Sequence, residues 1–279
     1  MQVTVASVKG DGVENEDGVF VALPGCVAVL DGLSAPKDLP MACRHGTPWL
    51  VRQLGTRLVA LGSDHDLPLA SVLRIAIEEV NGLHADTCML EQEAVPAATV
   101  VMLRERPEAF DYLVLSDSVL VLDTGSSVKA LADSRVEDVA KTEMAAALAG
   151  PAGTPERTAR VSELVARQRG LRNRPGGYWV ASTAPEAADH AITGSIQGGD
   201  LRRAALLTDG ASRLADLFHE ATWEEVLDLL DQEGPSALLA RVRAAERADN
   251  TGTRWPRFKV RDDATAAYAV VDPGEPSLH

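Results

Sequence analysis

The feature that most constrains the fold is the grouping of short apolar segments into two blocks separated by helical patterns. The early block holds VTVASV and VFVALPGCVAVLD, with Pro24–Gly25 as the turn inside the second segment. The later block begins with ATVVMLR, DYLVLSD, SVLVLD and VKALAD across short turns, and continues with YWVAST, RAALLTDG and ATAAYAVV. Such runs are typical of antiparallel meanders. This order predicts an α+β fold, an αββα sandwich in which two antiparallel sheets pack face to face beneath outer helices.

Helical periodicity marks the segments between and after these strands. Apolar residues recur every three or four positions in 49–61 and 69–83, and helices are also expected near 223–232 and 235–248. The Ala-, Arg- and Glu-rich stretch 136–174 predicts a helical, flap-like insertion that ends at NRPGG. Neither an internal repeat nor a long linker interrupts the chain. We therefore expect a single domain over residues 1–279.

The composition limits the expected partners and compartment. The chain has 27 basic and 41 acidic residues and a net charge of −14, which repels nucleic acid and anionic lipid. No apolar stretch reaches the roughly 18 residues of a membrane span, and the first residues do not resemble an export signal. Three cysteines without a CxxC motif favour a reducing compartment. We expect a cytoplasmic monomer that binds neither nucleic acid nor membrane.

Acidic residues stand at the ends of five apolar segments. A single Asp–Gly pair after a strand is usually a turn signal, but five recurrences would bring repelling carboxylates together at sheet edges. Hard divalent cations offset that repulsion, because magnesium and manganese prefer carboxylate, carbonyl and water oxygens. Zinc is disfavoured there, since few histidines and cysteines are suitably spaced. The motifs are Asn15–Glu16–Asp17, Asp31–Gly32, Asp117, Asp209–Gly210 and Asp262–Asp263. They predict an all-oxygen metal site at one end of the sandwich.

The order of these motifs resembles a known family. NED, DG, an AT strand, DS, TDG and DD-A-T occur in the order of the metal-dependent protein phosphatases, type 2C, over residues 6–271. The chain resembles a divergent, bacterial-type member with a single domain. The resemblance implies an αββα sandwich with two manganese or magnesium ions in a cleft at one end. It also implies hydrolysis of phosphoserine and phosphothreonine esters by a water that the ions activate.

Carried onto this sequence, the resemblance implies a role for each acidic motif. Asp31 would bridge the two ions, and the carbonyl of Gly32 would bind one of them. Asp117 stands where relatives can hold a weaker third ion, on the side of the site at which Asp209 lies. The implied metal ligands are Asp17, Asp31, Gly32, Asp209 and Asp262, with Asp31 and Asp209 as the central catalytic positions. The implied auxiliary residues are Glu16, acting through water, and Asp263, which stands where many relatives have asparagine.

Two positions depart from the family pattern and concern the substrate. Gly12 stands where many relatives have a phosphate-binding arginine, and Leu33 stands where many have a histidine proposed as the acid for the leaving group. Arg44 could bind phosphate and His45 could supply the acid, while the alternative for both is an ordinary structural role near a helix start. Arg174 is a second candidate phosphate contact, or simply a solvated cation.

Two other patterns have simpler interpretations. His84 and Cys88 are four residues apart on an expected helix, but a pair without further ligands is interpreted as incidental. The basic segment 255–261 adjoins Asp262, and it is expected to screen the metal site or to contact an anionic substrate.

The sequence leaves three functions open. The leading hypothesis is a metal-dependent phosphomonoester hydrolase acting on phosphorylated proteins. A phosphatase of the same fold acting on small phosphoesters is the second, because the usual substrate-binding residues are missing. The third is a non-catalytic pseudophosphatase that binds or regulates, and retention of the predicted metal ligands argues against it.

Overall fold

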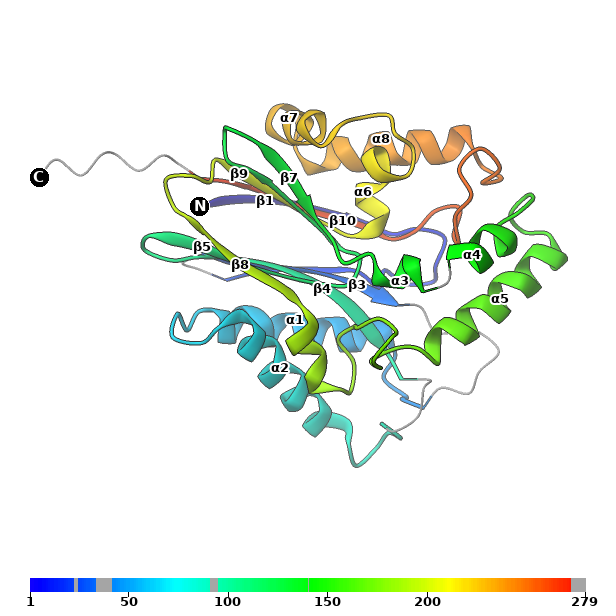
Figure 1. Ribbon diagram of the computed structural model, residues 1–279, viewed down its shortest axis with the longest axis horizontal. Helices are drawn as coiled ribbons and strands as arrows, with labels where there is room; N and C mark the ends of the chain where they lie inside the picture. Colours follow the sequence, from blue (N-terminus) through cyan, green and yellow to red (C-terminus); the bar gives the residue numbers. More distant parts are fainter. Residues whose placement is uncertain (23–24, 34–41, 91–94, 140, 272–279) are drawn as a thin grey trace, which may run out of the picture.

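Two five-stranded antiparallel sheets form the centre of the molecule in a computed structural model that describes residues 1–22, 25–33, 42–90, 95–139 and 141–271 (Figure 1). The expected turn at Pro24–Gly25 lies partly outside these residues. The first sheet has the order β1 (Gln2–Val8), β10 (Ala264–Val270), β9 (Arg203–Leu207), β6 (Val119–Asp123) and β7 (Val128–Leu131). The second has the order β2 (Gly18–Ala22), β3 (Cys26–Leu33), β4 (Ala97–Glu105), β5 (Ala109–Leu115) and β8 (Ile192–Gln197).

Helices cover the outer faces of both sheets, as the sequence predicted (Figure 1). The second sheet is covered by α1 (Thr47–Gly62), α2 (Leu69–His84) and the short 3₁₀ helix η1 (Pro185–His190). The first sheet is covered by α6 (Asp209–Asp216), α7 (Trp223–Glu233) and α8 (Pro235–Ala248). Between β7 and η1 the chain forms α3 (Arg135–Asp138), α4 (Lys141–Ala147) and α5 (Pro155–Arg169). In Figure 1, α4 and α5 lie beyond the end of the sheets to which β3 runs.

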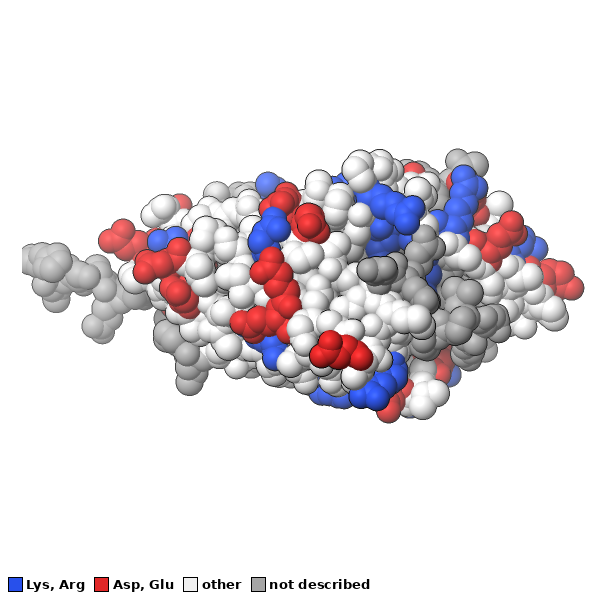
Figure 2. Space-filling view, turned by 90° about the horizontal axis from the view of Figure 1, so that it is seen from below, with Lys and Arg blue, Asp and Glu red and all other residues white. Residues whose placement is uncertain are grey.

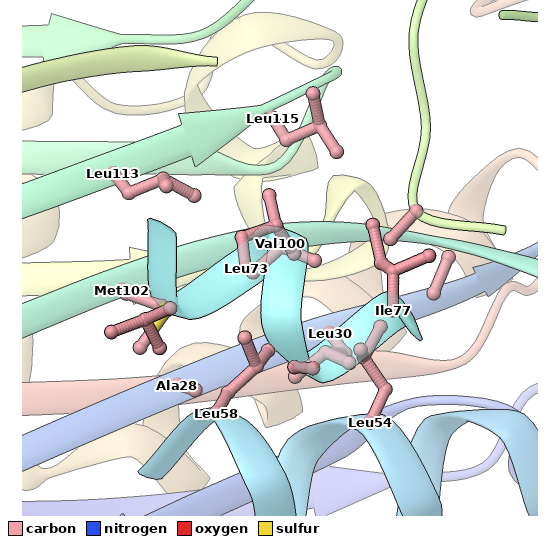
Figure 3. Close-up of a cluster of buried hydrophobic side chains, with 14 of the residues drawn as sticks. Ala28, Leu30, Leu54, Leu58, Leu73, Ile77, Val100, Met102, Leu113 and Leu115 are labelled. Atoms are coloured by element: carbon pink, nitrogen blue, oxygen red, sulfur yellow. The ribbon is translucent and has the colours of Figure 1, made fainter. Parts of the chain in front are cut away.

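Three apolar layers hold the four layers of structure together. Val29 and Leu206 belong to the layer between the sheets, which holds valine, leucine and alanine side chains of both. A second layer joins α1 and α2 to their sheet, and Figure 3 shows Leu54 and Leu58 facing Leu30 of β3. The third layer packs α6, α7 and α8 onto the first sheet. Strands β3, β4, β6 and β10 are buried on both faces, which accounts for their continuous apolar runs, and burial of one face of each helix accounts for the helical periodicity.

Three segments differ from the sequence prediction: YWVAST, β8, and α6, which begins where only an Asp–Gly turn was expected. YWVAST does not form a strand: Ala181 makes an isolated bridge to Ala98, and Trp179 stacks on His190 with ring centroids 3.6 Å apart. Its apolar side chains are buried by packing rather than by sheet pairing, so burial imitated a strand pattern. Strand β8 was not predicted, because ITGSIQ at the sheet edge carries only partly buried side chains.

The face formed by α1 and α2 carries mixed charge. Figure 2 shows small groups of acidic and basic side chains separated by uncharged surface on this side. No helix among the described residues is long and apolar enough to cross a lipid bilayer.

Candidate metal centre

The sheet topology brings the predicted acidic residues to one end of the sandwich. Strands β9 and β10 pair in antiparallel register with Leu207 opposite Ala266, so the end of β9 lies beside the start of β10. Asp209 follows β9 and is the first residue of α6, and Asp262 precedes β10 by two residues. Asp31 lies near the end of β3, and Asp17 directly precedes β2. These four carboxylates interact electrostatically with one another.

This concentration of charge disfavours ionisation of the carboxyl groups. Burial, together with the charges of Asp209 and Asp262, raises the pKa of Asp17 to about 8. Burial and the neighbouring aspartates raise the pKa of Asp31 well above its usual range, and Asp117 adds to that effect. Burial and Asp209 also raise the pKa of Asp262. A group of carboxylates that repel one another in a partly buried site is stabilised by a cation between them.

The two oxygens of the Asp17 carboxylate differ in their contacts with the described residues. Its Oδ1 is buried and unpartnered among the described residues, whereas Oδ2 accepts a hydrogen bond of 2.9 Å from the hydroxyl of Thr208. Thr208 is held in turn by the backbone N–H of Thr265, which donates to the Thr208 hydroxyl at 2.9 Å. Thr208 therefore fixes one side of the Asp17 carboxylate and leaves the other oxygen available to a ligand.

Asp263 fixes the segment that carries Asp17. The backbone N–H groups of Gly10 and Glu16 donate to its two carboxylate oxygens, each at 2.7 Å. A side chain on Gly32 would collide with the carbonyl oxygen of Glu16, so the backbones of both motifs pack directly against each other. Asp263 thus holds the segment before β2 in place, and its role as an auxiliary residue of a metal site remains a prediction.

Two cations reach the same site. Lys259 Nζ lies 2.6 Å from Asp262 Oδ1, and Arg213 Nη2 lies 3.1 Å from Asp262 Oδ2. Although burial disfavours its charged form, Asp262 raises the pKa of Lys259, and Asp31 and Asp209 contribute. Arg213 is also paired with the fully buried Glu246 at 2.8 Å. The basic segment after residue 255 therefore contributes one direct contact to the acidic site.

A cavity of about 300 Å³ opens beside the carboxylates. Asp117, Asp209 and Asp262 line it from the sandwich, and Phe258 lines it from the segment before β10. Its remaining wall includes side chains from the α3–α5 region, among them Met144. The stretch predicted as a flap-like insertion thus forms part of the wall of this cavity.

None of the three predicted substrate contacts lines the cavity. Arg44 and Arg174 are exposed. The ring of His45 stacks on Trp49 at a centroid distance of 4.4 Å, and its Nδ1 lies 3.4 Å from the sulfur of Cys88. All three therefore remain predictions as substrate contacts, and His45 belongs to a separate cluster.

Sequence reasoning missed three residues that shape the site. Thr208 precedes Asp209 and could have been noticed as a hydroxyl at a strand end. Arg213 lies one helical turn after Asp209 in α6. Because no helix was expected there, the spacing of four residues between Asp209 and Arg213 was not recognised as placing them on the same side. Lys259 was seen only as a member of a basic segment.

The donor set fits hard divalent cations. Carboxylate and carbonyl oxygens from Asp17, Asp31, Gly32, Asp209 and Asp262 are the ligands that manganese and magnesium prefer, and the free oxygen of Asp17 is suitably placed for one. Lys259 and Arg213 neutralise part of the negative charge, so they compete with such ions for Asp262.

Solved structures share this fold. No known family model and no curated protein matches the sequence. The serine/threonine phosphatase Stp1 from Staphylococcus aureus is 11% identical with a TM-score of 0.59, over 97% of this chain and 95% of that one. The Mycobacterium tuberculosis serine/threonine phosphatase PstP is 14% identical with a TM-score of 0.57, over 97% and 98% of the two chains. The catalytic domain of PstP in complex with two manganese ions is 16% identical with a TM-score of 0.52, over 97% of this chain and 98% of that one. The predicted αββα sandwich of these bacterial phosphatases is therefore confirmed.

Proposed function

We propose that this chain is a manganese- or magnesium-dependent phosphomonoester hydrolase that acts on phosphoserine and phosphothreonine in proteins. The observation that carries the proposal is the convergence of Asp17, Asp31, Asp209 and Asp262 beside a cavity, with one Asp17 oxygen that has no hydrogen-bond partner in the described part of the chain. The shared fold with serine/threonine phosphatases supports it.

Each residue has a definite part in this proposal. The four aspartates and the Gly32 carbonyl hold two ions, and Asp117 holds a weaker third ion near Asp209. Bound ions supply an activated water and neutralise the phosphoryl oxygens. Thr208 and Asp263 hold the segment before β2 in place, and Glu16 contributes through water. The cavity receives the phosphoester, with Arg44, His45 and Arg174 as candidate substrate contacts.

The wider organisation is part of the same proposal. Residues 1–279 form one domain, and the stretch 136–174 acts as a flap over the cavity. The protein works as a cytoplasmic monomer on phosphorylated proteins, without nucleic acid or membrane partners. The acidic net charge of −14 supports the exclusion of nucleic acid.

The test is hydrolysis of p-nitrophenyl phosphate and of phosphoserine and phosphothreonine peptides with added manganese or magnesium. Asp209→Asn is expected to lower the rate by at least about a hundredfold, because a charged metal ligand is replaced by a neutral one. Asp66→Asn, on the exposed α1–α2 connection, is the matched control and should retain wild-type activity. Equal rates for Asp209→Asn and wild type would exclude the metal mechanism. Hydrolysis of small esters without any phosphopeptide would favour a small-molecule phosphatase.

A second candidate is a non-catalytic module of the same fold. The contacts that favour it are those of Lys259 and Arg213 with Asp262, since fixed cations can replace metal ions in balancing the carboxylates. Manganese titration monitored by electron paramagnetic resonance separates the two. A protein that binds no manganese and hydrolyses no ester would be the non-catalytic module.

A further inference from the structure

A second cluster of candidate metal ligands lies at the ends of α1 and α2. The cluster consists of Cys43, His45, His84 and Cys88, and one ligand atom from each lies within 4.8 Å of all the others. Cys43 and His84 are buried, with exposed fractions of 1% and 3%. Two sulfurs and two imidazole nitrogens facing one another are the donor set of a tetrahedral zinc site.

The distances match that geometry. Zn–S bonds of about 2.3 Å and Zn–N bonds of about 2.0–2.1 Å place neighbouring ligand atoms roughly 3.3–3.8 Å apart. The sulfur of Cys43 lies 3.4 Å from that of Cys88, 3.4 Å from Nδ1 of His84 and 3.6 Å from Nδ1 of His45. The sulfur of Cys88 lies 3.4 Å from Nδ1 of His45. These three sulfur–nitrogen pairs therefore already have the separation of about 3.5 Å that one ion requires, and the two sulfurs lie about 0.3 Å closer together than the roughly 3.75 Å of two tetrahedral Zn–S bonds.

The fold holds the cluster from two sides. Cys43 and His45 lie in the loop that leads into α1, and His84 is the last residue of α2. The backbone N–H of Cys88 donates to the carbonyl of His84 at 3.0 Å, which extends the helical turn and places both side chains on the same side. A hydrogen bond of 2.9 Å from the N–H of Met89 to the carbonyl of Ala42 ties the loop to this turn.

Backbone N–H groups and one aromatic ring surround the four candidate ligands. Backbone N–H groups of His45 and Gly46 approach the sulfur of Cys43, and that of Arg44 approaches the sulfur of Cys88. Such N–H donors stabilise sulfur ligands that carry negative charge. Trp49 of α1 packs against both histidine rings, at centroid distances of 4.4 Å to His45 and 4.9 Å to His84.

We infer that Cys43, His45, His84 and Cys88 bind one structural zinc ion. Four protein ligands leave no open position, which is the arrangement of structural rather than catalytic zinc sites. The ion would join the loop before α1 to the end of α2. That loop follows Asp31 and Gly32 in the chain, and Thr47 packs within 2.6 Å of the position of a side chain on Gly32. The zinc would thus stabilise the region beside the carboxylate site without taking part in the chemistry, and a zinc-bound His45 would not also contact the substrate, so the two roles of His45 are alternatives.

The ligand atoms of the two sites select different metal ions. Thiolate and imidazole ligands select zinc, whereas the all-oxygen carboxylate site selects manganese or magnesium. The interpretation of His84 and Cys88 as an incidental pair considered spacing along one helix only, and the partners come from a loop about forty residues earlier in the chain. A disulfide between Cys43 and Cys88 is the competing use of the thiols, although their sulfurs lie at 3.4 Å rather than the bonded distance of about 2.05 Å.

Metal analysis of the full-length protein, purified under reducing conditions without chelators, tests the inference. We expect one zinc per chain by mass spectrometry of the metal content, and loss of that zinc in Cys88→Ser and in His84→Gln. Cys26→Ala, which changes the third cysteine, and Asp31→Asn, which changes the carboxylate site, should both retain it. In wild-type protein, cobalt substitution should give the intense visible absorption of a tetrahedral ion together with a sulfur-to-cobalt charge-transfer band.

The cobalt spectrum is recorded on wild-type protein. The inference can therefore be refuted even if a variant fails to fold. Substoichiometric zinc after loading, a cobalt spectrum without the sulfur band, or a Cys43–Cys88 disulfide in the reduced preparation would each overturn it. Zinc lost from Asp31→Asn but kept in Cys88→Ser would assign the metal to the carboxylates instead. None of these readouts depends on phosphatase activity, so zinc binding and the proposed function can fail separately.

Discussion

At the scale of single residues, Lys259 is the side chain whose charge bears most directly on metal binding. Its ammonium lies 2.6 Å from Asp262 and must give way when an ion takes that carboxylate. We predict that Lys259→Met binds manganese roughly two- to fivefold more tightly than wild type, because a partly exposed ion pair of up to about 1 kcal/mol no longer competes. Calorimetric titration measures this difference.

Lys129→Met is the matched control for that titration. Lys129 is exposed on β7, and its replacement removes the same charge without touching the carboxylates. Weaker manganese binding in Lys259→Met than in Lys129→Met would show that the ammonium assists the ion instead of competing with it.

Asp263 supports a prediction about stability. Its two oxygens accept hydrogen bonds from Gly10 and Glu16, and an asparagine offers only one oxygen. Asp263→Asn should therefore lower the free energy of unfolding by about 1–2 kcal/mol, since one partly buried N–H loses its charged acceptor. Urea unfolding monitored by circular dichroism measures the change. Unchanged stability would mean that the segment before β2 rearranges to satisfy both N–H groups.

Residue-level prediction from the sequence succeeded where a side chain follows directly from its place on a strand. Asp31 and Asp209 stand at or just after the ends of strands, so the end of the sheets at which they lie could be predicted. The cluster around Cys43 could not, because it depends on how the loop before α1 folds against the end of α2. Contacts between a loop and a distant helix leave no periodic signal in a single sequence.

At the scale of elements, the connection between α8 and β10 is held by one carboxylate. Asp249 accepts hydrogen bonds from the N–H groups of Thr253, Arg254 and Trp255, and pairs with Arg257 at 2.8 Å. Although burial opposes ionisation, these contacts lower the pKa of Asp249 to about 2 from a usual value of 3.8. The stabilisation is therefore fully present above the unfolded pKa and is lost as the pH falls through about 2.

This sign gives a prediction for Asp249→Asn. At pH 7 the variant should be about 2 kcal/mol less stable than wild type, and roughly half of the difference should remain at pH 3. Urea unfolding at pH 7, 5, 4 and 3 measures it, with Asp66→Asn as a control at an exposed aspartate. A difference that is constant from pH 7 to pH 3 would show that the hydrogen bonds, and not the charge, hold this connection.

Elements with a clear period were predictable, and those that depend on position in the sandwich were not. The helices α1 and α2 agree with prediction because each has one continuous apolar face. Helix α6 is only eight residues long and begins at Asp209, where the Asp–Gly pair indicated a turn. Strand β8 was not predicted because it lies at the edge of its sheet, where its residues are only partly buried or exposed and need little apolar character.

At the scale of the whole molecule, one end of the sandwich is destabilised by repulsion between buried carboxyl groups. The three apolar layers stabilise the fold along its length, whereas the carboxylates at the end of β3 repel one another. Stability and function therefore place opposite demands on the same residues, which is common at functional sites. The apolar runs of the sequence predicted the layers, which the structure confirms, and the acidic residues that end these runs lie at one end of the sandwich, where their role as metal ligands remains a prediction.

Asp31→Asn tests this opposition directly. Without divalent ions, the variant should be more stable than wild type by roughly 0.5–2 kcal/mol, because burial and the neighbouring aspartates disfavour an ionised carboxylate at Asp31, and an asparagine needs neither to carry that charge nor to take up a proton on folding. With manganese in excess, the order should reverse, since an ion that binds only the folded state stabilises wild type by about 2.7 kcal/mol at a hundred times its dissociation constant. Thermal unfolding with and without manganese measures both effects, and Asp66→Asn controls for a change of charge alone. If manganese raises the unfolding temperature of both proteins equally, the ion binds away from Asp31. If the variant is less stable than wild type under both conditions, favourable contacts of the Asp31 carboxylate outweigh its repulsion by the other aspartates.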